Sequence, residues 1–287
     1  MTEAERKQII DLVQREVVPA IGCTEPIAVA LCVAKATETL GTRPEKISVL
    51  LSANILKNAM GVGIPGTGMI GLPIAIALGA LVGKSEYQLE VLKDSNPAAV
   101  DEGKRFIAEK RINISLKENI SEKLYIEVCC ESGENKATAI IAGGHTTFIY
   151  IARNGGILFS RQNASSEETK EQTVDLTLRK VYDLGMDAPL DEIRFILETA
   201  RQNKAAAESS FDKNYGHGLG RMLRGTYEHK ILGDSVFSHI LSYTSGACDA
   251  RMAGAMIPVM SNSGSGNQGI SATLPVLVYA CLLYTSP

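Results

Sequence analysis

The sequence has no tryptophan, and only 5% of its 287 residues are aromatic. Proteins that bind single-stranded nucleic acid usually stack the bases on aromatic side chains, so this composition argues against that function. An excess of one charge is also lacking, because 29 basic residues stand against 32 acidic ones without a long run of either. Since no basic patch is present, we expect no nucleic-acid partner.

Long hydrophobic runs are missing as well. The most apolar stretch, residues 70–82, is short and contains Gly71, Pro73 and Gly79, which predicts a buried element and no membrane span. The N-terminus, Met-Thr-Glu-Ala-Glu-Arg-Lys, carries no hydrophobic secretory segment. None of the six cysteines forms a Cys-x-x-Cys pair. These absences predict a cytoplasmic protein with reduced thiols and no membrane partner.

Hydrophobic periodicity divides the chain into helical and sheet-forming parts. Apolar residues at helical spacing predict helices over 5–18, 26–40, 174–184, 191–206 and 218–245. A predicted strand at 46–51 precedes a glycine-rich loop at 61–71 and a buried helix that ends near residue 81. Between 111 and 159 the period changes to two, with turn residues between the alternating segments, and this pattern predicts an antiparallel sheet.

These patterns predict an α+β fold, in which a mainly helical body carries a sheet region. We expect three parts: residues 1–110, which are helical and contain the glycine-rich loop; the sheet region at 111–160; and a second helical part at 161–280. The length suits one large domain or two ordinary ones, with enough chain for a buried core.

Cys23 stands immediately before a predicted helix, in the run Ile-Gly-Cys-Thr-Glu-Pro at 21–26. Gly22 allows the backbone to bend, and Pro26 suits the first helical turn. A cysteine at a helix N-terminus feels the positive end of the helix dipole, which favours the thiolate that binds metals. A buried structural cysteine is the alternative, and this motif alone does not decide between the two.

Two glycine-rich segments and one histidine are further candidates for a site. Residues 260–269, Met-Ser-Asn-Ser-Gly-Ser-Gly-Asn-Gln-Gly, offer hydroxyl, amide and backbone N–H groups that suit an anion such as a carboxylate, although an interhelical loop has the same composition. Residues 65–73, Pro-Gly-Thr-Gly-Met-Ile-Gly-Leu-Pro, are a weaker case, with Thr67 as the ligand contact. His145 follows two glycines at a strand edge, where a histidine can act as a base or can hold a turn.

Together with these segments, four more stretches resemble the iron–sulfur L-cysteine desulfidase family, also called the serine dehydratase alpha-like family. They are Ser-Ala-Asn-Ile-Leu-Lys-Asn at 52–58, Leu-Glu-Val-Leu-Lys-Asp at 89–94, Gly-Gly-His-Thr at 143–146 and Asp-Ala-Arg-Met at 249–252. The resemblance follows the chain in order to about residue 275. It implies a lyase that converts L-cysteine to pyruvate, ammonia and hydrogen sulfide by β-elimination. L-serine dehydration and a non-catalytic amino-acid-binding module are the alternatives.

The resemblance also implies a [4Fe-4S] cluster, with one iron open to substrate. Cys23 matches the family's first cluster ligand, and the remaining ligands are expected beyond the end of this chain. His145 is the candidate catalytic residue. The candidate substrate-binding residues are Thr24, Glu25, Asn58, Thr67, Ser261, Asn262, Ser263, Gly264, Ser265, Gly266 and Asn267. The expected partners are L-cysteine or L-serine, with a homo-oligomer as a further possibility.

The C-terminal segment has an unusual ending. Residues 271–283 predict a helix, yet the chain stops at Tyr-Thr-Ser-Pro without a capping signal. Family relatives continue past this point, and residues 281–287 resemble translated sequencing-adapter read-through. We therefore expect a C-terminally truncated chain with a non-native tail at 281–287, which would not hold a complete cluster and would be inactive by itself.

Overall fold

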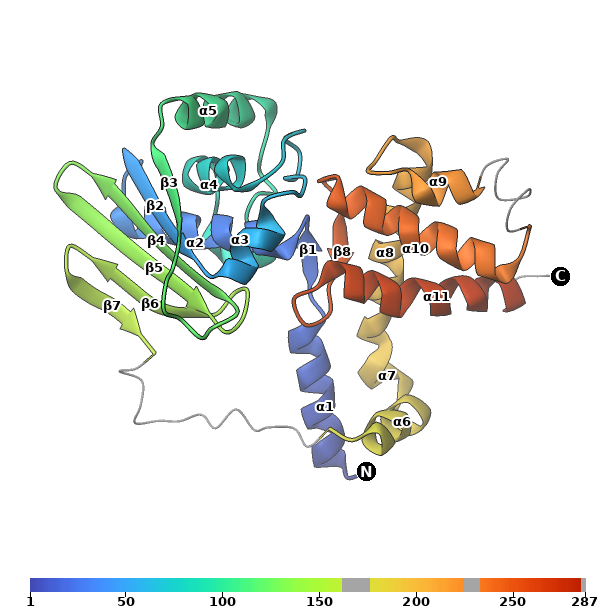
Figure 1. Ribbon diagram of the computed structural model, residues 1–287. Helices are drawn as coiled ribbons and strands as arrows, with labels where there is room; N and C mark the ends of the chain where they lie inside the picture. Colours follow the sequence, from blue (N-terminus) through green and yellow to red (C-terminus); the bar gives the residue numbers. More distant parts are fainter. Residues whose placement is uncertain (162–175, 225–232, 285–287) are drawn as a thin grey trace.

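The computed structural model describes residues 1–161, 176–224 and 233–284, and these residues form two parts that lie side by side (Figure 1). One part contains a six-stranded sheet with helices packed on it, and the other part is helical. The expected α+β class is therefore confirmed.

The large sheet is built from strands β2 to β7 in the order β3-β2-β4-β5-β6-β7. Their bounds are β2 (Lys46–Leu51), β3 (Ile112–Leu116), β4 (Tyr125–Ser132), β5 (Asn135–Ala142), β6 (Phe148–Arg153) and β7 (Gly156–Ser160). The strands expected between 111 and 159 are present, but the sheet is mixed, because β3 runs parallel to β2 while the other neighbours are antiparallel. The crossover between β2 and β3 passes through several helices, and such a connection returns the chain in the same direction.

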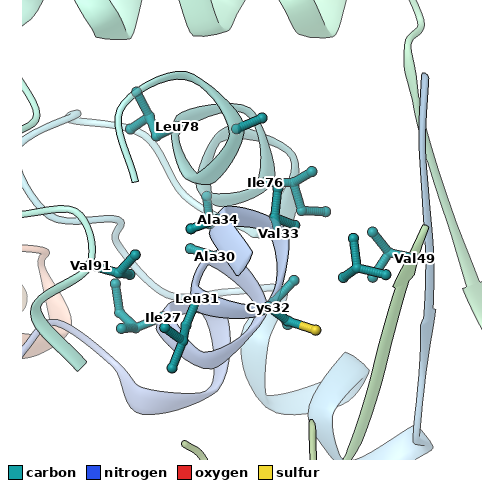
Figure 2. Close-up of a cluster of buried hydrophobic side chains, with 14 of the residues drawn as sticks. Ile27, Ala30, Leu31, Cys32, Val33, Ala34, Val49, Ile76, Leu78 and Val91 are labelled. Carbon is teal, nitrogen blue, oxygen red and sulfur yellow. The ribbon is translucent and has the colours of Figure 1, made fainter. Parts of the chain in front are cut away.

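Helices cover this sheet in successive layers. They are α2 (Thr24–Leu40), α3 (Ala53–Ala59), α4 (Leu72–Leu81), the 3₁₀ segment η1 (Ser85–Glu90) and α5 (Pro97–Ala108). Helix α2 packs on β4 and β5, α4 packs on α2, and α5 packs on α4. Figure 2 shows side chains of α2 together with Ile76 and Leu78 of α4 and Val49 of β2.

Small residues allow α2 and α4 to approach closely. A Cβ placed on Gly79 would lie 2.6 Å from the carbonyl oxygen of Ala30, so only glycine fits at this crossing. Helix α2 ends where the sequence predicts, at Gly41, which has a φ of +79°. Its apolar residues are almost all buried, so α2 forms the centre of the main core.

The helical part contains α1 (Glu3–Glu16), α6 (Leu178–Asp187), α7 (Leu190–Ile193), the 3₁₀ segment η2 (Arg194–Ile196), α8 (Leu197–Asp212), α9 (Leu219–Arg224), α10 (Val236–Met252) and α11 (Gly266–Tyr284). The prediction of one helix over 218–245 is wrong, because α9 and α10 are separate. Gly233 has a positive φ, and the Ser235 side chain caps the start of α10. A second core lies between α8, α10 and α11.

Helix α11 is, within the described residues, the one helix long and apolar enough to cross a membrane by length and composition. Core helices of globular proteins meet the same criterion. In this fold α11 packs against α8 and α10, and its residues Ile270 and Leu274 are fully buried in the second core.

Candidate functional site

A short two-stranded ribbon joins the two parts and brings distant segments together. Strand β1 (Pro19–Ile21) pairs antiparallel with β8 (Pro258–Met260), so that the turn after β1 lies beside the loop after β8. Ser261 strengthens this junction, because its backbone N–H and its hydroxyl both donate to the carbonyl of Val18, at 2.9 and 2.7 Å. The glycine-rich loop and the Cys23 turn therefore meet, although about 240 residues separate them in the chain.

A cavity of about 320 Å³ lies at this junction. Its walls come from the start of α2, from α3, from the β5–β6 turn, from the end of α10 and from the loop before α11. The lining residues are Cys23, Thr24, Glu25, Asn58, Val62, His145, Arg251, Met252, Ser263, Gly264, Ser265 and Asn267. Seven of the eleven predicted substrate-binding residues line this cavity, together with the predicted cysteine and histidine.

Cys23 occupies the N-cap position of α2 and is 6% exposed. Its Sγ donates to Oε2 of Glu25 at 3.0 Å. Burial raises the pKa of this thiol to about 11, the negative charge of Glu25 acts in the same direction, and Arg251 partly opposes both. Burial thus opposes the thiolate form that a helix N-terminus favours.

Glu25 and His145 form an ionisable pair on the cavity wall. Burial alone would raise the pKa of Glu25, but hydrogen bonds from Cys23 and from the backbone, together with His145, hold this pKa below its ordinary value. Burial lowers the pKa of His145, with Arg251 acting in the same direction and Glu25 opposing. At neutral pH these shifts favour a charged carboxylate beside a neutral imidazole.

His145 lies in the turn between β5 and β6, where the Thr147 N–H donates to the Gly144 carbonyl. The turn carries the imidazole across to the helical part, against Gly264. A Cβ placed on Gly264 would lie 2.4 Å from Nδ1 of His145, so the absence of a side chain at this position permits the contact.

Arg251 is a cavity residue that we did not predict. It lies near the end of α10 and is only 4% exposed. Its Nη1 donates to Oδ1 of Asn267 at 3.0 Å. The sequence offers one signal for it, namely its place in the stretch 249–252 that resembles the family.

Thr67 does not line this cavity. Its hydroxyl donates to the Ile64 carbonyl at 2.8 Å and accepts from the Met69 N–H at 2.9 Å, so it holds the shape of its own loop. The loop packs against the turn that precedes Cys23, because Pro65 contacts Gly22. A Cβ on Gly22, which has a φ of +79°, would lie 2.4 Å from Cγ of Pro65.

Three residues of the second glycine-rich segment also do not line the cavity. Ser261 is fully buried and bonded to β1 as described above. Asn262 exchanges backbone hydrogen bonds with Ser265 across a tight turn. Gly266 packs against the Arg251 side chain, since a Cβ there would lie 2.2 Å from its Nε. These residues shape the loop that carries Ser263, Gly264, Ser265 and Asn267.

A second cavity of about 600 Å³ adjoins the first. The two share His145, Ser263 and Gly264, so these residues form the wall between them. Arg15, Glu16 and Arg161 contribute charges to the larger cavity. The smaller one is the candidate functional site, because it also holds the thiol of Cys23 and the Glu25 carboxylate.

The donor set for an iron–sulfur cluster is incomplete in the part of the chain that the structure describes. A [4Fe-4S] cluster is held mainly by cysteine thiolates. Cys23 is the one cysteine on the cavity wall, and no group of three potential metal-binding side chains occurs among the described residues. Cys248 packs against the second core, and Cys32 is fully buried against the sheet. The residues present fit one ligand of a cluster and no more.

Comparison with known proteins identifies the family. A family model described as the serine dehydratase alpha chain matches residues 86–285, which is more than half of the sequence. The chain belongs to the serine dehydratase alpha chain family. The matched region includes His145, Arg251 and the whole 260–269 loop, whereas the Cys23 turn precedes it.

Curated relatives extend the likeness to nearly the whole chain. A UPF0597 protein of Bacteroides fragilis is 80% identical over 280 residues, which cover 98% of this chain and 65% of the relative. UPF0597 proteins of Bacteroides thetaiotaomicron and Porphyromonas gingivalis are 75% and 49% identical, with 65% and 66% of their lengths covered. The chain thus spans slightly less than two thirds of the length of these UPF0597 relatives. No solved structure matches the chain.

Proposed function

We propose that this member of the serine dehydratase alpha chain family takes part in the β-elimination of L-cysteine to pyruvate, ammonia and hydrogen sulfide. The observation that carries the proposal is the 320 Å³ cavity, in which a thiol, a carboxylate, an imidazole and a guanidinium group come together from three distant segments. Because the chain spans 65% of its relatives' length, the proposal concerns the part of the site that these residues build.

The elimination breaks the Cα–H and Cβ–S bonds of the amino acid. The Cα proton passes to a base, and the sulfur leaves with the bonding electrons as hydrosulfide. The resulting aminoacrylate tautomerises to an imine, which water hydrolyses to pyruvate and ammonia. His145 suits the role of base, because burial lowers its pKa and leaves a neutral imidazole that can accept a proton. The ionised Glu25 carboxylate suits the substrate's ammonium group.

In this proposal Cys23 is one ligand of a [4Fe-4S] cluster, and the other ligands lie outside the described residues. The cluster would supply the Lewis acid that assists departure of the leaving group. Cys23 must lose its proton to bind iron. The nearby Arg251 favours that loss, because its positive charge lowers the pKa of the thiol.

L-serine dehydration is the second candidate. The description of the matching family, serine dehydratase alpha chain, favours it. The Cα–H bond breaks in the same way, and the Cβ–O bond breaks in place of Cβ–S, so that hydroxide leaves in place of hydrosulfide.

The test is anaerobic purification of the chain, and of the full-length Bacteroides fragilis relative in parallel, each supplied with iron and sulfide. We expect the relative to release pyruvate and ammonia from L-cysteine, with sulfide in equal amount. Replacing the cysteine equivalent to Cys23 by serine should abolish turnover, because a hydroxyl is a poor iron ligand at neutral pH. Pyruvate from L-serine alone would support the second candidate, and pyruvate from neither amino acid would overturn the lyase proposal.

The setting proposed for this activity is the cytoplasm, with a small amino acid as partner, no nucleic acid or membrane partner, and a homo-oligomeric assembly. All six cysteines are free thiols, which suits a reducing compartment.

A further inference from the structure

Arg251 is a buried cation without an acidic partner. Besides the Asn267 amide oxygen, its Nη1 contacts Sδ of Met252 at 3.5 Å, and both of these acceptors are neutral. Its Nε is buried and has no hydrogen-bond partner. Within the described chain Arg251 forms no ion pair, whereas most other buried charges in folded proteins are paired.

Such a guanidinium is unfavourable unless something supplies the opposite charge. Arginine stays protonated at any physiological pH, so it cannot relieve the burial by losing its proton. The side chain lines the 320 Å³ cavity, so an anion that enters the cavity can reach it. An anionic ligand would satisfy both the charge and the unpaired donor.

The first turn of α11 offers further donors at the same place. Among the described residues, the N–H groups of Gly266 and Asn267 donate to no backbone carbonyl. Helix α11 is 19 residues long, so its N-terminus carries the full positive end of the helix dipole. Because Gly266 has no side chain, the Arg251 guanidinium lies directly against this turn.

We propose that Arg251 and the first turn of α11 bind the α-carboxylate of the substrate. A guanidinium presents two parallel N–H groups that match the two oxygens of a carboxylate. A carboxylate held there places Cα and Cβ of a small amino acid within the same cavity as Cys23 and His145. The inference rests on the proposed function for the identity of the ligand. It restricts the substrates to amino acids with a free carboxylate and excludes their amides and esters.

The test uses acetate as the probe and acetamide as its uncharged isostere, with binding measured by calorimetry on the 287-residue chain. Wild-type protein should bind acetate and not acetamide. Arg251→Gln should weaken acetate binding at least about 10-fold, because a charge-assisted hydrogen-bond pair is lost. Arg251→Lys keeps the positive charge but lacks the planar guanidinium, so its affinity for acetate should lie between those of wild type and Arg251→Gln. Arg201→Gln, on the exposed face of α8, is the matched control and should bind acetate as the wild type does.

Denaturant unfolding shows whether Arg251→Gln is folded. Since Arg251 lacks a counterion, Arg251→Gln should unfold at the same denaturant concentration as wild type or at a higher one. Acetate binding within 2-fold of wild type in Arg251→Gln, or equal binding of acetamide, would overturn the inference. If acetate binds through Arg251 but the full-length relative releases no pyruvate, the lyase proposal fails and the carboxylate site stands.

Discussion

Gly264 is the position at which one added methyl group tests the geometry of the cavity. Its φ is +75°, and a Cβ would lie 2.4 Å from Nδ1 and 2.9 Å from Cε1 of His145. Gly264→Ala therefore imposes a backbone conformation that L-residues rarely adopt, and it also displaces the imidazole. Both effects should lower the free energy of unfolding.

The two effects can be separated with a control in the same protein. Gly155 has a φ of +81° in the β6–β7 turn, and a Cβ there would meet nothing within 4 Å. Gly155→Ala should cost only the backbone strain, about 1 kcal/mol. Gly264→Ala should cost roughly 2–4 kcal/mol, because overpacking adds about 1–3 kcal/mol to the same strain. Denaturant unfolding of the two variants measures the difference.

A double variant identifies the imidazole as the cause. In a His145→Ala background the obstructing ring is absent, so Gly264→Ala should cost no more than the Gly155→Ala control. If Gly264→Ala and Gly155→Ala cost the same in the wild-type background, the contact between Gly264 and His145 does not exist. In that case His145 and Gly264 would not separate the two cavities as described.

Two further variants test the supports of the site and of the helical part. Asn203 is fully buried, and its side-chain amide hydrogen-bonds to the backbone of both β8 and α11. Asn203→Ala should lower the free energy of unfolding by about 2–3 kcal/mol, because two backbone groups lose their partner. A loss below about 0.5 kcal/mol would contradict this bridge. A hydrogen bond from the Thr2 backbone and, to a smaller extent, one from the Lys180 side chain lower the pKa of Glu5 from 4.5 to about 2. Its stabilising effect is thus present above pH 4.5 and lost as the pH falls to about 2. Unfolding curves should show Glu5→Gln less stable than wild type at pH 7 and equal to it at pH 2, and an undiminished difference at pH 2 would refute the assignment.

Local patterns predicted those elements whose bounds depend on local sequence. Strand β2 spans Lys46–Leu51 as expected, and α2 ends at Gly41 because glycine adopts the left-handed conformation that ends helices. The mixed sheet could not be predicted. The place of β2 between β3 and β4 depends on pairing between residues far apart in the chain, which no local period records.

The same distinction applies to the site. Sequence reasoning selected Cys23 and His145, which line the cavity, but also Thr67, whose hydroxyl is used by its own backbone. A sequence shows that a side chain is polar and does not show whether a nearby carbonyl already binds it. Arg251 was missed for a related reason, since an arginine near the end of a helix usually lies at the surface and favours the helix dipole. Its burial depends on α11, which comes from elsewhere in the chain and places Gly266 directly against the Arg251 side chain.

The pairing of β1 with β8 has a consequence for synthesis of the protein. Cys23 leaves the ribosome long before Pro258–Met260 exists to pair with the strand that precedes it. At about 5–20 residues per second, the thiol waits on the order of 10–50 seconds without the wall that later shields it. During this interval oxidants and stray metal ions can reach it more easily than in the finished fold. The loop after β8 therefore closes the site around a thiol that was synthesised about 240 residues earlier.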